Sequence, residues 1–291
     1  MPLDITPLHP RFGAIVDGVD LRQVTADHLY PDIRAAFETH SALLFRAQSL
    51  SEQDHTRLAT LFGPLENRPA IAAGRDLAFE VSNLSNKTED GVLDPNDLKA
   101  LNLRANQLWH TDSTFLPVPA LVNILMAAVV PSTGGQTEFA STRAAWADMP
   151  QELKQPLTDA IIWHRFSHSR ARISPELANW RQISQWPDRP WRSVWTNPVT
   201  GEDALYIASH SFTIEGMGID DGQALIDRAI EFCTQPHYVY THDWQVGDVL
   251  LWDERAILHR GCPWPMEEPR VMRSVCCSAT KADGLDSVRI V

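Results

Sequence analysis

Short blocks of apolar residues separated by polar turns run through the whole chain, which predicts many short strands with a few helices between them. The predicted strands lie at residues 13–22, 42–45, 121–130, 239–240 and 249–252. The apolar run 121–130 is bounded by Pro119 and Pro131, and these prolines are typical of strand ends. This run is therefore predicted to be a central strand of a sheet.

Apolar residues at three- and four-residue spacing predict the helices. These helices cover residues 25–39, 51–62, 141–146, 150–161 and 220–232. Thr25 or Asp27 is expected to cap the first helix, and Ser51 is expected to cap the second. Scattered strands with a few helices indicate a mainly β (α+β) protein.

Two long segments have no simple periodicity. Residues 66–106 are polar and irregular, which is typical either of a lid over a functional site or of a disordered loop. Residues 163–200 hold half of the ten tryptophans and many arginines. This second segment is either an insertion whose aromatic residues pack on the body of the protein, or a second wall of a pocket with an arginine for an acidic substrate.

Composition narrows the class of protein. The chain of 291 residues has 44% hydrophobic and 21% charged residues, which fits one globular domain over 1–291. Its net charge of −12 argues against nucleic acid or an anionic membrane as a partner. No apolar run is long enough for a membrane helix, and no signal peptide is recognisable. The four cysteines show no Cys-x-x-Cys spacing, which indicates free thiols in a reducing cytoplasm.

A metal-binding pattern stands in the middle of the chain. His110 and Asp112 are two residues apart, so on an extended strand both side chains would point to the same face. Two histidines and one carboxylate hold non-haem Fe(II) in a facial triad, and His259 in the C-terminal quarter could complete one. Arg270 follows His259 by eleven residues and could bind a dicarboxylate.

From Thr6 to about Ala279 the sequence resembles the TauD/TfdA family of Fe(II)- and 2-oxoglutarate-dependent dioxygenases, in particular the 2,4-dichlorophenoxyacetate dioxygenase branch. The similar stretches follow one another in order at residues 7–12, 16–22, 43–48, 62–66, 106–112, 130–137, 244–248, 252–253 and 259–260. So many ordered matches identify the family, although they leave the substrate open.

The resemblance implies a double-stranded β-helix (jelly roll) with flanking helices. It implies that Fe(II) is bound by His110, Asp112 and His259, and that the distal carboxylate of 2-oxoglutarate is held by Thr137 and Arg270. O2 would then oxidise a C–H bond of a small organic acid, such as an aryloxyalkanoate, a sulfonate or sulfate, or an amino-acid derivative, with release of succinate and CO2. A homodimer or homotetramer is also implied.

The substrate pocket departs from the family pattern at one position. Many members that bind anionic substrates have a second arginine four residues after the first, but here that position is Ser274 and the arginine is Arg273. A shift of one residue on a strand moves a side chain to the opposite face, so Arg273 reaches the pocket only if a bulge redirects it. The candidate substrate contacts are Asn106, Phe166, His210 and Arg273.

Two other kinds of protein could use the same residues. A hydrolase could bind zinc through the same three ligands, although it would not need Arg270 and Thr137 as a cosubstrate clamp. A non-catalytic jelly-roll binding protein could retain the triad as an inherited shell.

Overall fold

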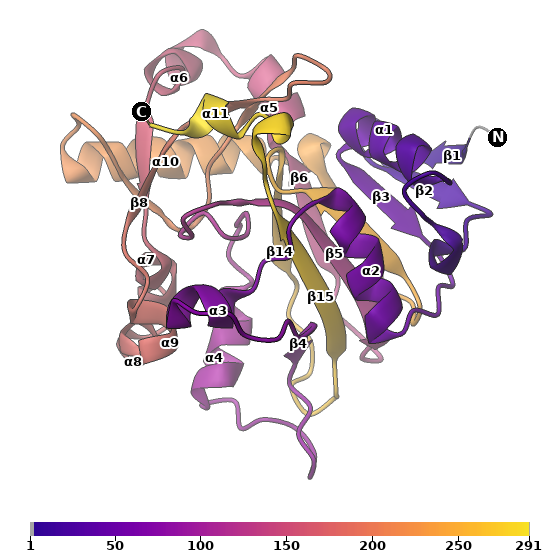
Figure 1. The fold of residues 1–291 in the computed structure, drawn as a ribbon. Helices are drawn as coiled ribbons and strands as arrows, with labels where there is room; N and C mark the ends of the chain where they lie inside the picture. Colours follow the sequence, from indigo (N-terminus) through magenta and orange to yellow (C-terminus); the bar gives the residue numbers. More distant parts are fainter. Residues whose placement is uncertain (1–2, 291) are drawn as a thin grey trace.

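The computed structural model describes residues 3–290 (Figure 1). The strands are β1 (Asp4–Pro7), β2 (Ala14–Asp17), β3 (Ala42–Phe45), β4 (Ser82–Ser85), β5 (Ala120–Val129), β6 (Thr137–Ser141), β7 (Ile161–His164), β8 (Arg189–Arg192), β9 (Val194–Thr196), β10 (Asp203–Leu205), β11 (Ser211–Ile214), β12 (Val239–His242), β13 (Val249–Asp253), β14 (Ile257–Gly261) and β15 (Val271–Ser278). The helices are α1 (Tyr30–His40), α2 (Glu52–Phe62), α3 (Arg68–Ala73), α4 (Leu98–Ala105), α5 (Thr142–Asp148), α6 (Gln151–Lys154), α7 (Phe166–Ala171), α8 (Pro175–Asn179), α9 (Arg181–Ser184), α10 (Ile219–Cys233) and α11 (Leu285–Val288).

Two sheets carry the site. Within residues 3–290, the larger sheet has seven strands in the order β1-β2-β3-β13-β5-β15-β4, and the smaller one has the order β12-β6-β14. Phe139 of β6 and Ile257 of β14 share one buried cluster with Leu125 and Trp252 of the larger sheet. The rings of Phe139 and Trp252 lie 5.1 Å apart between centroids. The two sheets therefore pack face to face, which confirms the mainly β jelly roll predicted from the sequence.

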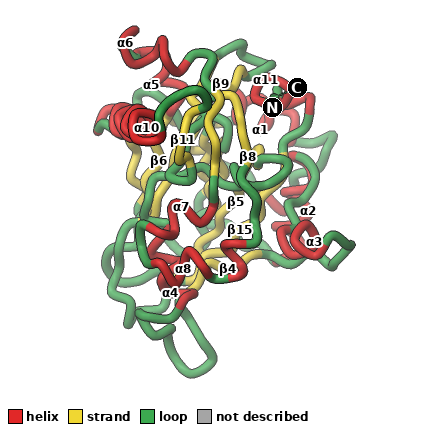
Figure 2. The backbone as a smooth tube through the Cα atoms, turned by 90° about the vertical axis from the view of Figure 1, so that its left-hand side faces the viewer, coloured by secondary structure: helices red, strands yellow, loops and turns green. Residues whose placement is uncertain are grey.

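Helices cover the outer faces of both sheets (Figure 1). Helices α1 and α2 pack on the outside of the larger sheet, where Phe37 and Leu58 belong to its outer core. Helices α5 and α10 cover the other side, through Trp146 and Ile226 among others. Because both of its faces are covered, strand β13 is buried along its whole length. Helices α4, α7 and α8 gather at one end of the molecule, as both views show (Figure 2).

Some predicted helix bounds were wrong. The first helix begins at Tyr30 and not at residue 25, because Thr25 and His28 exchange backbone hydrogen bonds in a tight turn and Pro31 stands at the helix start. The helix predicted at 150–161 is also shorter: Pro156 lies in a 3-10 turn after α6, and strand β7 begins at Ile161.

The segment 66–106 is more ordered than its polar sequence predicts. It contains α3, β4 and α4, and β4 pairs with β15 at the edge of the larger sheet. The Asn86 side chain fixes the segment, since it accepts the backbone N–H of Arg270 and donates to the carbonyls of Met266 and Glu268. A polar edge strand has no buried face of its own to mark it in the sequence, which explains why its pattern was missed.

Two expectations from composition can be compared with the structure. The cysteines Cys233, Cys262, Cys276 and Cys277 are all free thiols. Within residues 3–290, no helix has both the length and the apolar character that crossing a bilayer requires.

Replacing the cap of α2 should weaken the fold. Ser51 accepts the backbone N–H of Asp54, and the Asp54 carboxylate accepts the backbone N–H of Ser51 in return, which forms a capping box. The Ser51→Ala substitution should lower the free energy of unfolding by about 1 kcal/mol. Urea unfolding measures the change, and an unaltered midpoint would show that the cap contributes nothing.

Candidate metal centre

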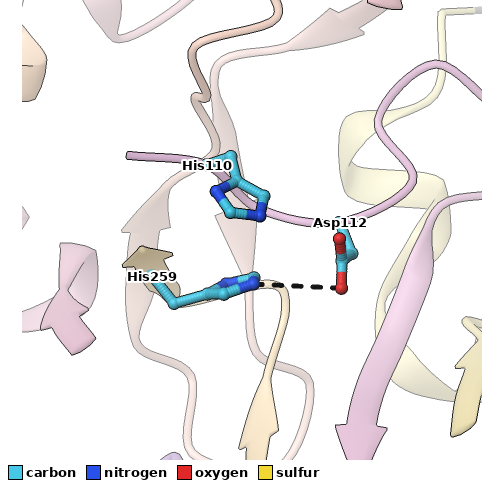
Figure 3. A group of neighbouring side chains, drawn as sticks. All are labelled: His110, Asp112 and His259. Atoms are coloured by element: carbon cyan, nitrogen blue, oxygen red, sulfur yellow. Dashed lines mark ion pairs between the residues drawn. The ribbon is translucent and has the colours of Figure 1, made fainter. Parts of the chain in front are cut away.

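A backbone bridge brings two distant histidines together. The N–H of His110 donates to the carbonyl of His259 at 3.0 Å, and the N–H of His259 donates back to His110 at 2.7 Å. Their rings lie 4.2 Å apart between centroids. Figure 3 shows both imidazoles and the Asp112 carboxylate facing a common space. The pairing of β14 with the 110 segment therefore places His259 beside the His-x-Asp motif.

From the sequence, the His-x-Asp motif is predicted to lie on an extended strand. In the structure it does not lie on a regular strand. Only His110 pairs as a strand residue, and the chain then enters a turn in which Ser113 has a φ of 66°. Thr111 ties this turn to the 254–257 segment by donating to the carbonyls of Glu254 and Ile257. The Glu254 carboxylate accepts the backbone N–H of Asp112 at 2.8 Å. These contacts, and not strand pleating, set the position of Asp112.

The three side chains form a ligand set without hydrogen bonds to one another. One ligand atom of each lies within 4.8 Å of the others. His259 Nε2 stands 3.9 Å from Asp112 Oδ2, which is beyond hydrogen-bond distance. The Nδ1 of His110 is bonded to the carbonyl of Leu108 at 2.7 Å, so the Nε2 of that ring remains available as a ligand.

The protonation states suit a cation. Burial lowers the pKa of His110 and lowers the pKa of His259 to about 3, so both imidazoles are neutral near pH 7. Burial alone would raise the pKa of Asp112, but the neighbouring His259 and Arg68 side chains hold it below its ordinary value. Neutral imidazoles and an ionised carboxylate are the forms that bind a divalent metal ion.

Asp112 is oriented by a chain of side chains that the sequence analysis missed. Asn123 Nδ2 donates to Asp112 Oδ2 at 2.7 Å, and Ser274 Oγ donates to Asn123 Oδ1 at 2.8 Å. Asn123 belongs to β5 and Ser274 to the neighbouring strand β15. A lone asparagine in an apolar strand was the only signal of this role in the sequence.

The ligand set opens into a cavity of about 780 Å³. Segment 66–106 lines it with residues of α3, β4 and α4, and the 163–200 segment lines it from α7. Of the residues predicted from the sequence, the cavity is lined by His110, Asp112, His259, Thr137, Arg270, Asn106, Phe166 and His210. Residues far apart in the chain, from Glu66 to Cys276, therefore meet at this one cavity.

Arg270 and Thr137 present unused donors to the cavity. Arg270 is buried, its Nε donates to the carbonyl of Gly135, and burial lowers its pKa to about 10. Within residues 3–290, no carboxylate lies within 4.0 Å of its guanidinium. Gly135 permits this approach, because a Cβ there would stand 3.2 Å from Arg270 Nε. Thr137 Oγ1 accepts the indole N–H of Trp244 at 2.9 Å, which leaves the hydroxyl proton free to donate.

The structure does not place Arg273, a candidate substrate contact, at the cavity. Along β15, Ser274 and Cys276 line the cavity, and Arg273 does not. Burial lowers the pKa of His55, a residue of α2 on the outer side of the sheet, to about 4, and the nearby charge of Arg273 contributes to this lowering. The bulges of this strand lie at Val271/Met272 and Cys277/Ser278, so neither turns Arg273 inward.

Comparison with known proteins agrees with this geometry. Residues 4–276 match the family described as taurine catabolism dioxygenase TauD, TfdA family. The chain is 34% identical to the alpha-ketoglutarate-dependent 2,4-dichlorophenoxyacetate dioxygenase of Cupriavidus pinatubonensis, over 94% of this chain and 96% of that protein. It is also 34% identical to the (S)-phenoxypropionate/alpha-ketoglutarate-dioxygenase of Sphingobium herbicidovorans, over 92% of each.

A solved structure has the same fold. The crystal structure of AAD-2 in complex with Mn(II) and N-oxalylglycine superposes with a TM-score of 0.88 at 30% identity, and covers 96% of this chain and 99% of that one. Membership of this family identifies the protein as an oxygenase. It excludes the zinc hydrolase and the non-catalytic binding protein, which the sequence left as alternatives. The chain belongs to the TauD/TfdA family of 2-oxoglutarate-dependent dioxygenases and resembles its 2,4-dichlorophenoxyacetate dioxygenase branch.

Proposed function

We propose that the protein uses Fe(II), 2-oxoglutarate and O2 to hydroxylate a C–H bond of a small organic acid, with release of succinate and CO2. The observation that carries this proposal is the facing set of His110, Asp112 and His259, whose ligand atoms lie within 4.8 Å of one another. Two neutral imidazoles and one carboxylate are the donors of a facial triad, which leaves positions open for other ligands. Bound iron would supply the activation of O2.

Arg270 and Thr137 are proposed to hold the distal carboxylate of 2-oxoglutarate. A buried guanidinium without an acidic partner is costly, and an incoming carboxylate offsets that cost through charge-assisted hydrogen bonds. The free hydroxyl proton of Thr137 could donate a further bond. The dicarboxylate would then lie between this clamp and the ligand set, which line the same cavity.

The substrate class follows from the relatives and from the walls of the cavity. The relatives named above act on aryloxy acids, and an alkylsulfatase of Acinetobacter baylyi is 27% identical over 99% of this chain. Phe79, Phe115 and Phe166 provide apolar lining here. An organic acid with an apolar body fits such walls, whereas a small polar acid would leave them unfilled.

Succinate formation tests the proposal. Protein loaded with Fe(II) under anaerobic conditions is mixed with 2-oxoglutarate, exposed to air, and assayed with aryloxyacetates, alkyl sulfates, sulfonates and N-acyl amino acids. Substrate-stimulated succinate is expected with one group of acids, and product analysis then distinguishes hydroxylation from ether cleavage and desaturation. Absence of stimulated succinate with every compound, despite bound iron, would contradict the proposal.

Removing the amide that orients Asp112 should weaken metal binding. Loss of groups that orient metal ligands typically costs about 10- to 100-fold in metal affinity. Asn123→Ala should therefore raise the Kd for Mn(II), measured by calorimetry, by about this factor. Ser274→Ala removes only the more distant link and should have a smaller effect. Equal Kd values for the wild type and Asn123→Ala would show that Asp112 needs no such support.

We propose that residues 1–291 act as one dioxygenase domain, in which 66–106 serve as a lid and 163–200 form a second wall of the pocket. A homodimer or homotetramer and a cytoplasmic location are also expected. Light scattering after gel filtration measures the mass of the assembly, and a monomer would exclude both oligomers.

A further inference from the structure

Three arginines line the cavity, and they differ in what neutralises them. Arg68 is paired, with its Nε 2.6 Å from the Glu66 carboxylate and its guanidinium 3.9 Å from Asp112. Arg270 is assigned above to 2-oxoglutarate. Arg170 of α7 is the third, and its side chain is 4% exposed. Within residues 3–290, Arg170 has no carboxylate within 4.0 Å.

Neutral groups hold Arg170 in place. Its guanidinium donates to Asn102 Oδ1 at 3.2 Å, to Ser169 Oγ at 3.0 Å and to Asn106 Oδ1 at 3.2 Å. It also lies 4.1 Å from the ring centroid of Phe166. An arginine has five N–H donors, so two of them have no partner among the described residues. The guanidinium is therefore fixed in orientation but has no ion-pair partner within 4.0 Å among the described residues.

The contacts of Arg170 place it beside the metal ligands. Asn106, which accepts from Arg170, also accepts the backbone N–H of Gly261 through its own carbonyl. Ser169, which accepts from Arg170 as well, is bonded to His210 Nδ1 at 2.8 Å. The ring of His210 lies 6.3 Å from the ring of His110 between centroids. Arg170 is thus connected to His110 through Ser169 and His210, and to the strand that carries His259 through Asn106.

We propose that Arg170 binds the acidic group of the substrate, in place of the arginine that many relatives carry where this chain has Ser274. This inference rests on the proposed function. A buried cation without a partner is unfavourable, and a substrate carboxylate would supply the missing charge together with two acceptors for the free N–H groups. Burial lowers the pKa of Arg170 to about 9, which an adjacent anion would reverse.

The surroundings of Arg170 point to an acid with an aromatic body. Phe115 and Phe166 stack at 3.9 Å with an interplanar angle of 16°, and Trp186 lies 5.7 Å from Phe115. Flat apolar rings beside a fixed guanidinium match an aryloxyalkanoate, whose ring and carboxylate are joined by a short linker. Segment 163–200 therefore supplies the cavity with one aromatic side chain, Phe166, and with the cation, Arg170.

Binding of phenoxyacetate and of 2-phenoxyethanol to the anaerobic complex with Mn(II) and 2-oxoglutarate tests the inference, with calorimetry as the measurement. The two probes share the ring and the linker, and only phenoxyacetate carries a charge. The wild type should prefer phenoxyacetate, and Arg170→Gln should weaken its binding about 10- to 100-fold while leaving phenoxyethanol nearly unchanged. Arg170→Lys keeps the positive charge but cannot form two parallel hydrogen bonds to a carboxylate. It should therefore recover part of the preference for phenoxyacetate that Arg170→Gln loses.

Arg172→Gln is the matched control, because Arg172 is exposed and follows Arg170 by two residues. It should bind both probes as the wild type does. Unchanged phenoxyacetate affinity in Arg170→Gln, or no preference for the acid in the wild type, would overturn the inference. The proposed function is tested separately by the succinate assay of the wild type, so a failure of one is distinguishable from a failure of the other.

Discussion

Asp112→Ala should abolish substrate-stimulated succinate formation. The substitution removes the only anionic donor of the ligand set, so loss of metal affinity should exceed the roughly 10- to 100-fold typical of groups that merely orient ligands. Activity should fall by at least about 100-fold at a metal concentration that saturates the wild type. Calorimetric titration with Mn(II) and the succinate assay measure the two effects together.

The fold should survive this substitution. The Asp112 carboxylate accepts a hydrogen bond from the side-chain amide of Asn123. Removal of the carboxylate leaves that amide unpaired, which costs about 1–3 kcal/mol of stability. Thermal unfolding should therefore remain cooperative. Asp286→Ala serves as the control, because this carboxylate is exposed and, among residues 3–290, its ion-pair partner is Lys281 at 3.8 Å. An Asp112→Ala protein that retained full activity with iron would remove the triad from the mechanism.

Arg270→Ala should raise the KM for 2-oxoglutarate much more than it lowers kcat. Loss of one partner from a buried charge pair costs about 2–5 kcal/mol, which corresponds to about 30-fold or more in affinity. Arg270→Lys should give a smaller increase, since it keeps the charge but loses the two parallel hydrogen bonds. Initial rates of succinate formation against 2-oxoglutarate concentration measure the change.

Arg273→Ala provides a matched control for the clamp. Arg273 lies on β15, three residues after Arg270, but does not line the cavity. Its removal should leave the KM for 2-oxoglutarate unchanged. An unchanged KM in Arg270→Ala would exclude Arg270 as the clamp, and a raised KM in Arg273→Ala would contradict the register of this strand.

Much of the architecture was predictable from the sequence because buried strands have a clear signature. Strand β3 is apolar along its length, β13 is apolar up to its last residue, and β5 is the long run between two prolines. Strand β4 escaped prediction because its residues, Ser82 to Ser85, are mostly polar. It forms only because backbone groups of β15 remain free at the edge of the sheet.

The candidate metal ligands could be predicted for a different reason. His110 and Asp112 are close in sequence, and resemblance to the family supplied His259 and Arg270. The supporting residues could not be identified, because Asn123 reaches Asp112 only through the packing of β5 beside β15. The same holds for Arg170, one of many arginines in segment 163–200, which the position of α7 at the cavity singles out.

The family, the jelly roll and the three candidate metal ligands could be inferred from the sequence. Buried strands and the His-x-Asp motif are local patterns, and resemblance along the whole chain supplied the topology and His259. Only the tertiary structure decided which polar side chains reach the cavity. On β15, side chains alternate between the two faces of the sheet, so Ser274 lines the cavity and Arg273 does not. Helix α7 lies beside α4, where Arg170 is buried at the cavity without a carboxylate partner. The direction of a side chain depends on the register of its strand, and the pairing of a buried charge depends on how the helices pack. A local sequence pattern encodes neither of them.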